Sequence, residues 1–122
     1  MPKKPERYDT GIRVADIDRE RPPSIETPWG PFALFALDDE LFAVQSFCPH
    51  LDGPLFQGTV SGESITCPWH RWRFSLRSGE RLDAFLPTPV SDDLVICDVA
   101  LSSEGTVILS NPHRVADVPR VE

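Results

Sequence analysis

The sequence contains no long apolar run: its 122 residues include no stretch of about 18 apolar residues, which argues against a transmembrane helix. Secretory features are also missing, because the positively charged first ten residues are followed by no apolar segment. Cysteine is scarce, and three cysteines, an odd number, do not suggest a disulfide framework. These absences predict a cytoplasmic protein in a reducing compartment, where cysteines serve metal or redox chemistry.

Basic residues are fewer than acidic residues. Lys and Arg together number 12 against 19 Asp and Glu, which gives a formal net charge of −7 and a sequence pI of about 4.9. Nucleic-acid binding depends on cations that neutralise phosphates, and anionic membranes attract cationic surfaces, so neither partner is expected. What remains is a small acidic protein whose partner, if it has one, presents a cationic surface.

Helical periodicity is also lacking. No window of about 11 residues holds a regular 3.6-residue apolar repeat, and 13 prolines disfavour helix interiors. Short apolar runs alternate with turn sequences instead, which predicts an all-β sandwich or barrel. After a first strand at 8–17, the expected hairpins pair 31–37 with 41–45, 58–60 with 65–66, 72–76 with 81–83, and 94–101 with 106–109.

Length and composition indicate one domain over residues 1–122. A hydrophobic fraction of 40% and a charged fraction of 25% are those of a globular chain rather than a disordered one. The polar segments 1–7 and 111–122 are expected to be flexible tails.

Two loops place cysteine and histidine together. The first is Cys48-Pro49-His50, directly after an apolar run, and the second is Cys67-Pro68-Trp69-His70, directly after the expected strand at 65–66. One such pair would most often be a core thiol beside a surface imidazole, but two pairs at equivalent strand ends favour a ligand set. Because a single hairpin joins the loops, the fold can bring four soft or borderline metal ligands to one point.

Two kinds of metal site could use these four ligands, a structural zinc site and an iron cluster. A structural zinc site usually opens with Cys-x₂₋₄-Cys and closes with His-x₃₋₅-His, a spacing that this sequence does not have. Here each loop supplies one ligand of each kind. Mixed pairs from two loops suit a two-metal cluster, in which the cysteines bind one iron and the histidines the other.

The paired motif resembles that of Rieske [2Fe–2S] proteins, and the resemblance extends over about 42–90, with a cluster-binding part at about 46–90. It implies a β-sandwich or barrel base with a small cluster-binding subdomain of loops and hairpins. It also implies that Cys48 and Cys67 bind the inner iron, and that His50 and His70 bind the outer iron. Two neutral imidazoles in place of two thiolates leave the oxidised cluster uncharged, which raises its potential into a range of roughly −150 to +300 mV.

The sequence departs from the high-potential branch of that family. Respiratory-complex members carry an extra cysteine in each loop, where this chain has Gly53 and Trp69, so their bracing disulfide cannot form. They also offer Ser and Tyr hydroxyls to the cluster sulfurs, where this chain has Trp72 and Phe74. Fewer hydrogen bonds to sulfur stabilise the reduced cluster less, so a low-potential, ferredoxin-type centre is predicted.

Three further residues, Arg71, Cys97 and His113, stand near or beyond the ligand loops. Arg71 stands where the family commonly has glycine, and either raises the potential, faces a partner or is simply solvated. Cys97 lies in an apolar run and is expected to be a buried core thiol. His113 is expected to be a solvated tail residue. An apolar collar is predicted around the ligand histidines, formed by Pro49, Leu51, Pro68, Trp69 and Pro87.

The chain lacks what a complete oxygenase needs. A mononuclear iron requires two histidines and a carboxylate, and only His113 remains after the cluster takes two of the three histidines. The sequence therefore predicts an electron carrier, a ferredoxin that passes electrons from a reductase to an oxygenase or similar terminal enzyme. Two alternatives remain: a small subunit resembling that of assimilatory nitrite reductase, and a structural zinc-binding interaction module.

Overall fold

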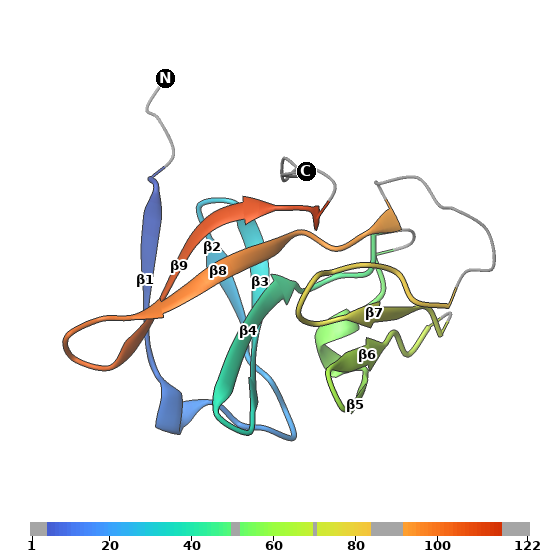
Figure 1. The fold of residues 1–122 in the computed structure, drawn as a ribbon, viewed down its shortest axis with the longest axis horizontal. Coiled ribbons are helices and arrows are strands. Elements are labelled where there is room, and N and C mark those ends of the chain that lie inside the picture. Colours follow the sequence, from blue (N-terminus) through green and yellow to red (C-terminus); the bar gives the residue numbers. More distant parts are fainter. Residues whose placement is uncertain (1–4, 50–51, 70, 84–91, 116–122) are drawn as a thin grey trace, which may run out of the picture.

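The computed structural model describes residues 5–49, 52–69, 71–83 and 92–115, and these form two antiparallel sheets (Figure 1). The larger sheet has the order β1-β9-β8-β4-β3-β2, and the smaller has the order β5-β6-β7. The predicted all-β class is confirmed. The larger sheet comprises β1 (Arg7–Arg13), β2 (Ser24–Thr27), β3 (Gly30–Leu37), β4 (Glu40–Gln45), β8 (Ile96–Leu101) and β9 (Thr106–His113). The smaller comprises β5 (Thr59–Ser61), β6 (Ser64–Thr66) and β7 (Arg73–Ser75).

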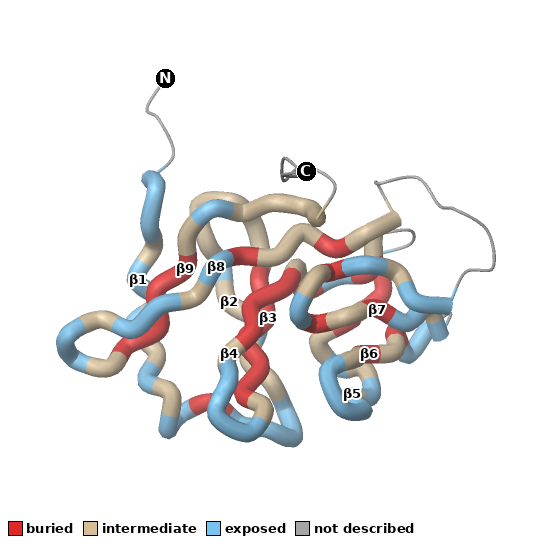
Figure 2. Tube along the Cα trace, viewed as in Figure 1, coloured by how far each residue is buried: buried red, intermediate tan, exposed pale blue. Residues whose placement is uncertain are grey.

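Strand β3 is buried on both faces, which explains its continuous apolar sequence (Figure 2). Because side chains alternate along a strand, Ala33 and Phe35 point into the core beneath the small sheet, whereas Phe32 and Leu34 point into a second core. Strand β4 alternates in the same way. We call these the loop-side core and the barrel-side core. The loop-side core contains Cys48 and Cys67, and the barrel-side core contains Cys97.

At each of the four predicted hairpins, the two segments pair in the antiparallel sense. Strands β3 and β4 pair across the turn at Asp38 and Asp39, and β5 pairs with β6 across Gly62. Beyond β7 the predicted third hairpin shrinks to an isolated bridge between Phe74 and Arg81. The predicted first strand is too long, because a 3₁₀ helix at Val14–Asp16 follows β1. Strand β2 and the 3₁₀ helix Leu55–Gln57 were not predicted.

Both expected tails are too long where the structure describes them. Arg7 already belongs to β1, and β9 continues to His113, which pairs with Ile96. A register irregularity opposite Ile96 and Asp98 accommodates Asn111, whose φ is 51°, and the following proline. His113 is therefore a half-buried strand residue rather than a tail residue, and its Nδ1 lies 2.6 Å from the carbonyl oxygen of Asn111. Residues 1–4 and 116–122 lie outside the described part.

An arginine links the two sheets. Arg77, just beyond β7, has its guanidinium 2.7 Å from Glu40 of β4 and 2.7 Å from Glu63 of the β5–β6 turn. The same guanidinium lies 5.2 Å from the centroid of the Phe42 ring. Because the guanidinium donates hydrogen bonds to Glu63 and Glu40, the pKa of Arg77 is raised further above its usual value. This contact helps fix the position of the small sheet, and thus of the loop that follows β6.

Candidate metal centre

The two cysteines of the predicted ligand set lie at strand ends on the loop-side core. Cys48 follows β4 by three residues, and Cys67 directly follows β6. Their relative exposures are 0% and 1%, and neither is in a disulfide. Buried thiols held close to the ends of strands are rigidly placed, which suits metal ligation.

The loops around the cysteines have the same backbone design. In the first loop (residues 48–53), the Cys48 N–H donates to the Gly53 carbonyl at 2.8 Å and the Asp52 N–H donates to the Cys48 carbonyl at 3.0 Å. In the second loop (residues 67–72), the Cys67 N–H donates to the Trp72 carbonyl at 2.8 Å and the Arg71 N–H donates to the Cys67 carbonyl at 3.0 Å. Asp52 and Arg71 occupy the same place and both have positive φ, 55° and 60°. Each cysteine therefore begins an equivalent turn.

The two loops touch each other at a glycine. A Cβ atom added at Gly53 would lie 3.1 Å from Cys67 Sγ and 3.1 Å from Trp69 Cδ2. A side chain at residue 53 would thus push against the thiol and the indole of the second loop. The structure confirms that the loops are brought together. Gly53 and Trp69, the two positions compared above with the extra cysteines of respiratory-complex proteins, thus lie side by side.

The predicted histidine ligands, His50 and His70, lie outside the described residues, as does Leu51. Among the residues that the structure describes, no group of three or more His, Cys, Asp or Glu side chains could hold a metal ion. The four-residue ligand set thus stays a prediction. The described half of it fits an iron–sulfur cluster, because two buried thiols in adjacent equivalent turns offer the soft sulfur ligands that such clusters use.

Aromatic side chains surround the second loop. Trp69 is 58% exposed although its indole lies against Gly53, so it both packs on the first loop and presents a surface. Phe74 is fully buried, and its ring centroid lies 6.3 Å from that of Trp72. Of the predicted apolar collar, the structure describes three residues, Pro49, Pro68 and Trp69. The other two, Leu51 and Pro87, lie outside the described residues.

Arg81 holds this region together, a role that the sequence did not reveal. Its guanidinium carbon lies 3.3 Å from the centroid of the Trp72 ring, and its nitrogens lie 2.9 Å from Asp83 and 3.5 Å from Asp92. Burial raises the pKa of the Asp83 carboxyl, but hydrogen bonds from the Arg81 side chain and the Arg73 N–H outweigh burial and hold the pKa below its usual value. The contact between Arg81 and Asp92 joins the described residues on either side of segment 84–91.

We expect Arg81→Ala to lower the free energy of unfolding by about 1 kcal/mol at pH 7, because it leaves the exposed Asp83 and the half-buried Asp92 without their cation and removes the guanidinium from the Trp72 ring. Urea denaturation measures this change, and Arg73→Ala, an exposed neighbour, is the control with an expected change within about 0.5 kcal/mol. The contribution of Asp83 is present above its ordinary carboxyl pKa and is lost as the pH falls toward its lowered folded value. The difference between wild type and Arg81→Ala should therefore shrink below about pH 4; a difference that is constant with pH would contradict this account.

The third cysteine is confirmed as a core thiol. Cys97 lies in β8 opposite Ala43, is 7% exposed, and packs in the barrel-side core. Burial, with a smaller effect of Asp98, raises the pKa of its thiol to about 12. Since the thiolate is the metal-binding form, this cysteine is poorly suited to be a ligand.

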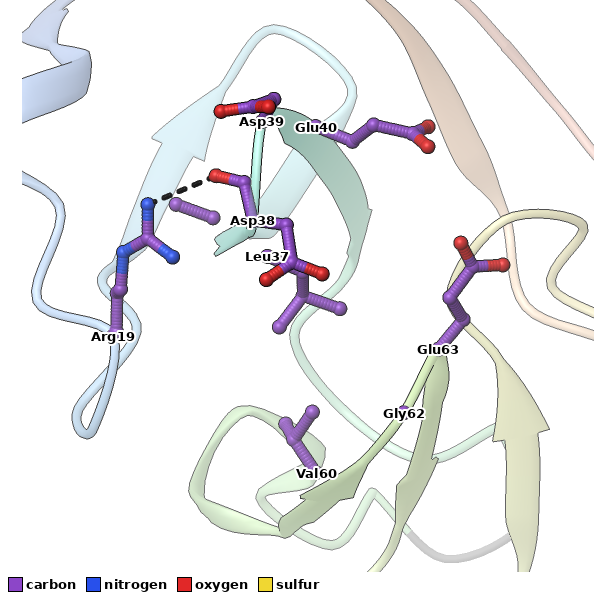
Figure 3. Close-up of a pocket in the computed structure, with 9 residues that line it drawn as sticks. Arg19, Leu37, Asp38, Asp39, Glu40, Val60, Gly62 and Glu63 are labelled. Carbon is purple, nitrogen blue, oxygen red and sulfur yellow. Dashed lines mark hydrogen bonds between the residues drawn. The ribbon is translucent and has the colours of Figure 1, made fainter.

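A separate acidic pocket lies at the other end of the small sheet. It has a volume of about 580 Å³ and is lined by the β3–β4 and β5–β6 turns (Figure 3). Arg19 donates to the Asp38 carbonyl at 3.0 Å across it. Strands β4 and β6 begin here and lead away to the cysteine loops. Four acidic residues, Asp38, Asp39, Glu40 and Glu63, line the pocket, and Arg77 pairs with the last two of them.

The family profile of the Rieske [2Fe–2S] domain matches residues 10–95, which include both cysteine loops. The chain therefore belongs to the Rieske [2Fe–2S] domain family. This confirms the resemblance found in the sequence, and the family implies a [2Fe–2S] cluster.

Solved structures share the fold. A ferredoxin of Sphingomonas yanoikuyae B1 superimposes with a TM-score of 0.68 at 24% identity, over 82% of this chain and 94% of that one. A candidate NADH-dependent nitrite reductase small subunit from Mycobacterium tuberculosis superimposes with a TM-score of 0.71 at 19% identity, over 86% of this chain and 94% of that one.

Curated relatives are much longer proteins. An oxygenase component of 3-ketosteroid-9-alpha-monooxygenase from Rhodococcus rhodochrous is 33% identical over 75 residues, which are 57% of this chain and 19% of that protein. Mouse apoptosis-inducing factor 3 is 31% identical over 74 residues, which are 61% of this chain and 12% of that protein. The chain thus spans less than a fifth of these two relatives.

Proposed function

We propose that this chain is a one-electron carrier whose Rieske-type [2Fe–2S] cluster is held by Cys48, His50, Cys67 and His70. The observation that carries the proposal is the pair of equivalent, touching turns that each begin with a buried cysteine. In each loop the sequence places a histidine two or three residues after that cysteine. When bound, the cluster supplies reversible one-electron redox chemistry.

The described residues give the centre a buried side and an open side. Cys48 and Cys67 face the loop-side core, where apolar side chains exclude water from the thiolates. Trp69, in the second loop, is exposed. Electrons therefore enter and leave on the side of the loops that faces away from the core, where a protein partner can approach.

The cluster is tested by iron and acid-labile sulfide analysis of the anaerobically purified protein, with its EPR spectrum after reduction by dithionite. We expect about two irons and two sulfides per chain, a red-brown colour and a Rieske-type signal. A colourless, EPR-silent protein with one zinc per chain would support the zinc-binding module instead. Direct electrochemistry tests the low-potential assignment, which a value well above about +150 mV would overturn.

A separate experiment tests whether the carrier is a free ferredoxin or a subunit of a larger enzyme. We propose a ferredoxin that takes electrons from a reductase and delivers them to an oxygenase or a similar terminal enzyme, and the relatedness to a monooxygenase component supports this choice. The structural similarity to a nitrite reductase small subunit keeps that role as the second candidate. Purification at native expression levels separates them, because a subunit co-purifies with a large catalytic chain whereas a ferredoxin is obtained alone.

A further inference from the structure

Arg71 occupies a backbone position that favours glycine. Its φ of 60° lies in the left-handed region, and its N–H donates to the Cys67 carbonyl, so the turn of the second loop imposes this conformation. Asp52 at the equivalent place in the first loop is a residue type that tolerates this region better than arginine does. A strained backbone at a functional loop indicates that the side chain serves a purpose there.

The guanidinium of Arg71 is the available cation of the second loop. Arg77 and Arg81 are both paired with carboxylates. Arg71 is exposed and, within the described part of the chain, makes no ion pair. Residues 64–76 contain two arginines, Arg71 and Arg73, and no acidic residue, so this stretch is positively charged although the whole protein is acidic.

Arg71 also lines a pocket. The pocket has a volume of about 270 Å³, and its other lining residues are Thr59, Thr66, Cys67 and Pro68. Thr59 and Thr66 are directly paired across β5 and β6, so two hydroxyl-bearing residues of the small sheet line the same pocket as Arg71. A guanidinium with neighbouring hydroxyl donors is a binding arrangement for a carboxylate, and the pocket has room for the end of one side chain.

We propose that Arg71 is a partner-recognition residue, which binds a carboxylate side chain of the redox partner in this pocket and so seats the partner against the second loop. The inference rests on the proposed electron-carrier function and names the chemistry of its partner's contact surface. The net charge of −7 attracts a partner whose surface is mainly basic. The single carboxylate then fixes the orientation of the complex, because a bidentate contact is directional.

Small redox probes of opposite charge test the local field without an identified partner. The reduced holoprotein is oxidised by ferricyanide, an anion, or by hexaamminecobalt(III), a cation, and each accepts one electron from the cluster. At low ionic strength we expect Arg71→Gln to slow oxidation by ferricyanide about fivefold and to speed oxidation by the cobalt complex. Arg71→Lys should keep wild-type behaviour. Arg13→Gln is the matched control, because it removes the same charge from an exposed position on β1, at the opposite side of the molecule (Figure 1).

The two probes also separate recognition from tuning of the cluster. A changed reduction potential would alter the rates with both probes in the same direction, whereas a surface charge alters them in opposite directions. Equal responses of Arg71→Gln and Arg13→Gln, or parallel changes with both probes, would overturn the inference. Absence of iron and sulfide from wild type would instead overturn the proposed function.

A thermal melt supplies a readout that does not depend on electron transfer. Arg71→Gly should melt at a higher temperature than Arg71→Gln, because glycine adopts the positive φ without strain. Both variants should respond alike to ferricyanide. A glycine variant that melts below the glutamine variant would show that the arginine position is not strained, and would remove the first support of the inference.

Discussion

Cys67→Ala should abolish the [2Fe–2S] centre, whereas Cys97→Ala should leave it intact. Cys67 lies in the second loop against Gly53, where its thiolate would bind iron, and no other described cysteine except Cys48 lies on the loop-side core. An iron lacking one of its two thiolates has an open coordination position, which exposes the cluster to hydrolysis. Cys97 lies in the other core with its thiol pKa raised by burial, so its loss should cost only packing, about 1 kcal/mol.

Iron and sulfide content per folded chain measures this difference, and circular dichroism verifies that both variants keep the β fold. Cys48→Ala should match Cys67→Ala, because the two loops are equivalent in hydrogen bonding. Retention of a full cluster by Cys67→Ala, or equal loss in Cys97→Ala, would refute the assignment of the inner-iron ligands.

Gly58→Ala should be much more damaging than Gly62→Ala in the neighbouring turn, with a loss of about 3 kcal/mol in the free energy of unfolding. Its Cβ would lie 2.2 Å from the Thr66 carbonyl oxygen and 2.9 Å from the Leu55 carbonyl oxygen, both backbone atoms. The backbone before Cys67 would have to move, which disturbs β5, β6 and the second loop together. The φ of Gly58, −73°, suits any residue, so close approach alone imposes the glycine.

Gly62→Ala is the matched control in the adjacent turn. Gly62 has a positive φ of 59° but nothing within 4 Å of an added Cβ, so alanine there should cost only backbone strain, about 1 kcal/mol. Urea denaturation of both variants compares the two effects. A Gly62→Ala variant less stable than Gly58→Ala would mean that the close contact with Thr66 relaxes easily.

The sequence predicted the hairpins in which a clear turn motif separates two apolar strands. Asp38-Asp39 and Gly62-Glu63 separate apolar runs, and both became hairpin turns because those residues accept tight-turn geometry. Strand β2 was missed because it is four residues long and follows two prolines. The end of β9 was mistaken for a tail because Pro112 breaks a regular ladder, while a local irregularity accommodates it.

The candidate site was predictable in its chemistry and not in its geometry. The ligand set was predicted from the spacing of Cys48, His50, Cys67 and His70. No sequence pattern, however, shows that the two turns have equivalent hydrogen bonds. The contact between Gly53 and Cys67 depends on how β4 and β6 are placed by tertiary packing. The contacts of Arg81 with Trp72 and Asp92 were overlooked for the same reason, since no sequence pattern shows them and they form only in the fold.

The double burial of β3 and β4 bears on whether the cluster-binding part could be excised as a minimal redox peptide. A fragment of about 46–90 would retain Cys48, Cys67 and the small sheet, but it would lose Ala33, Phe35, Phe42 and Val44, which fill the loop-side core from the larger sheet. Its apolar underside would then face water, and small β-sheets need such a covered face to be stable. The cluster-binding part is therefore not an autonomous module, and miniaturisation of this carrier must keep the strands that look remote from its chemistry.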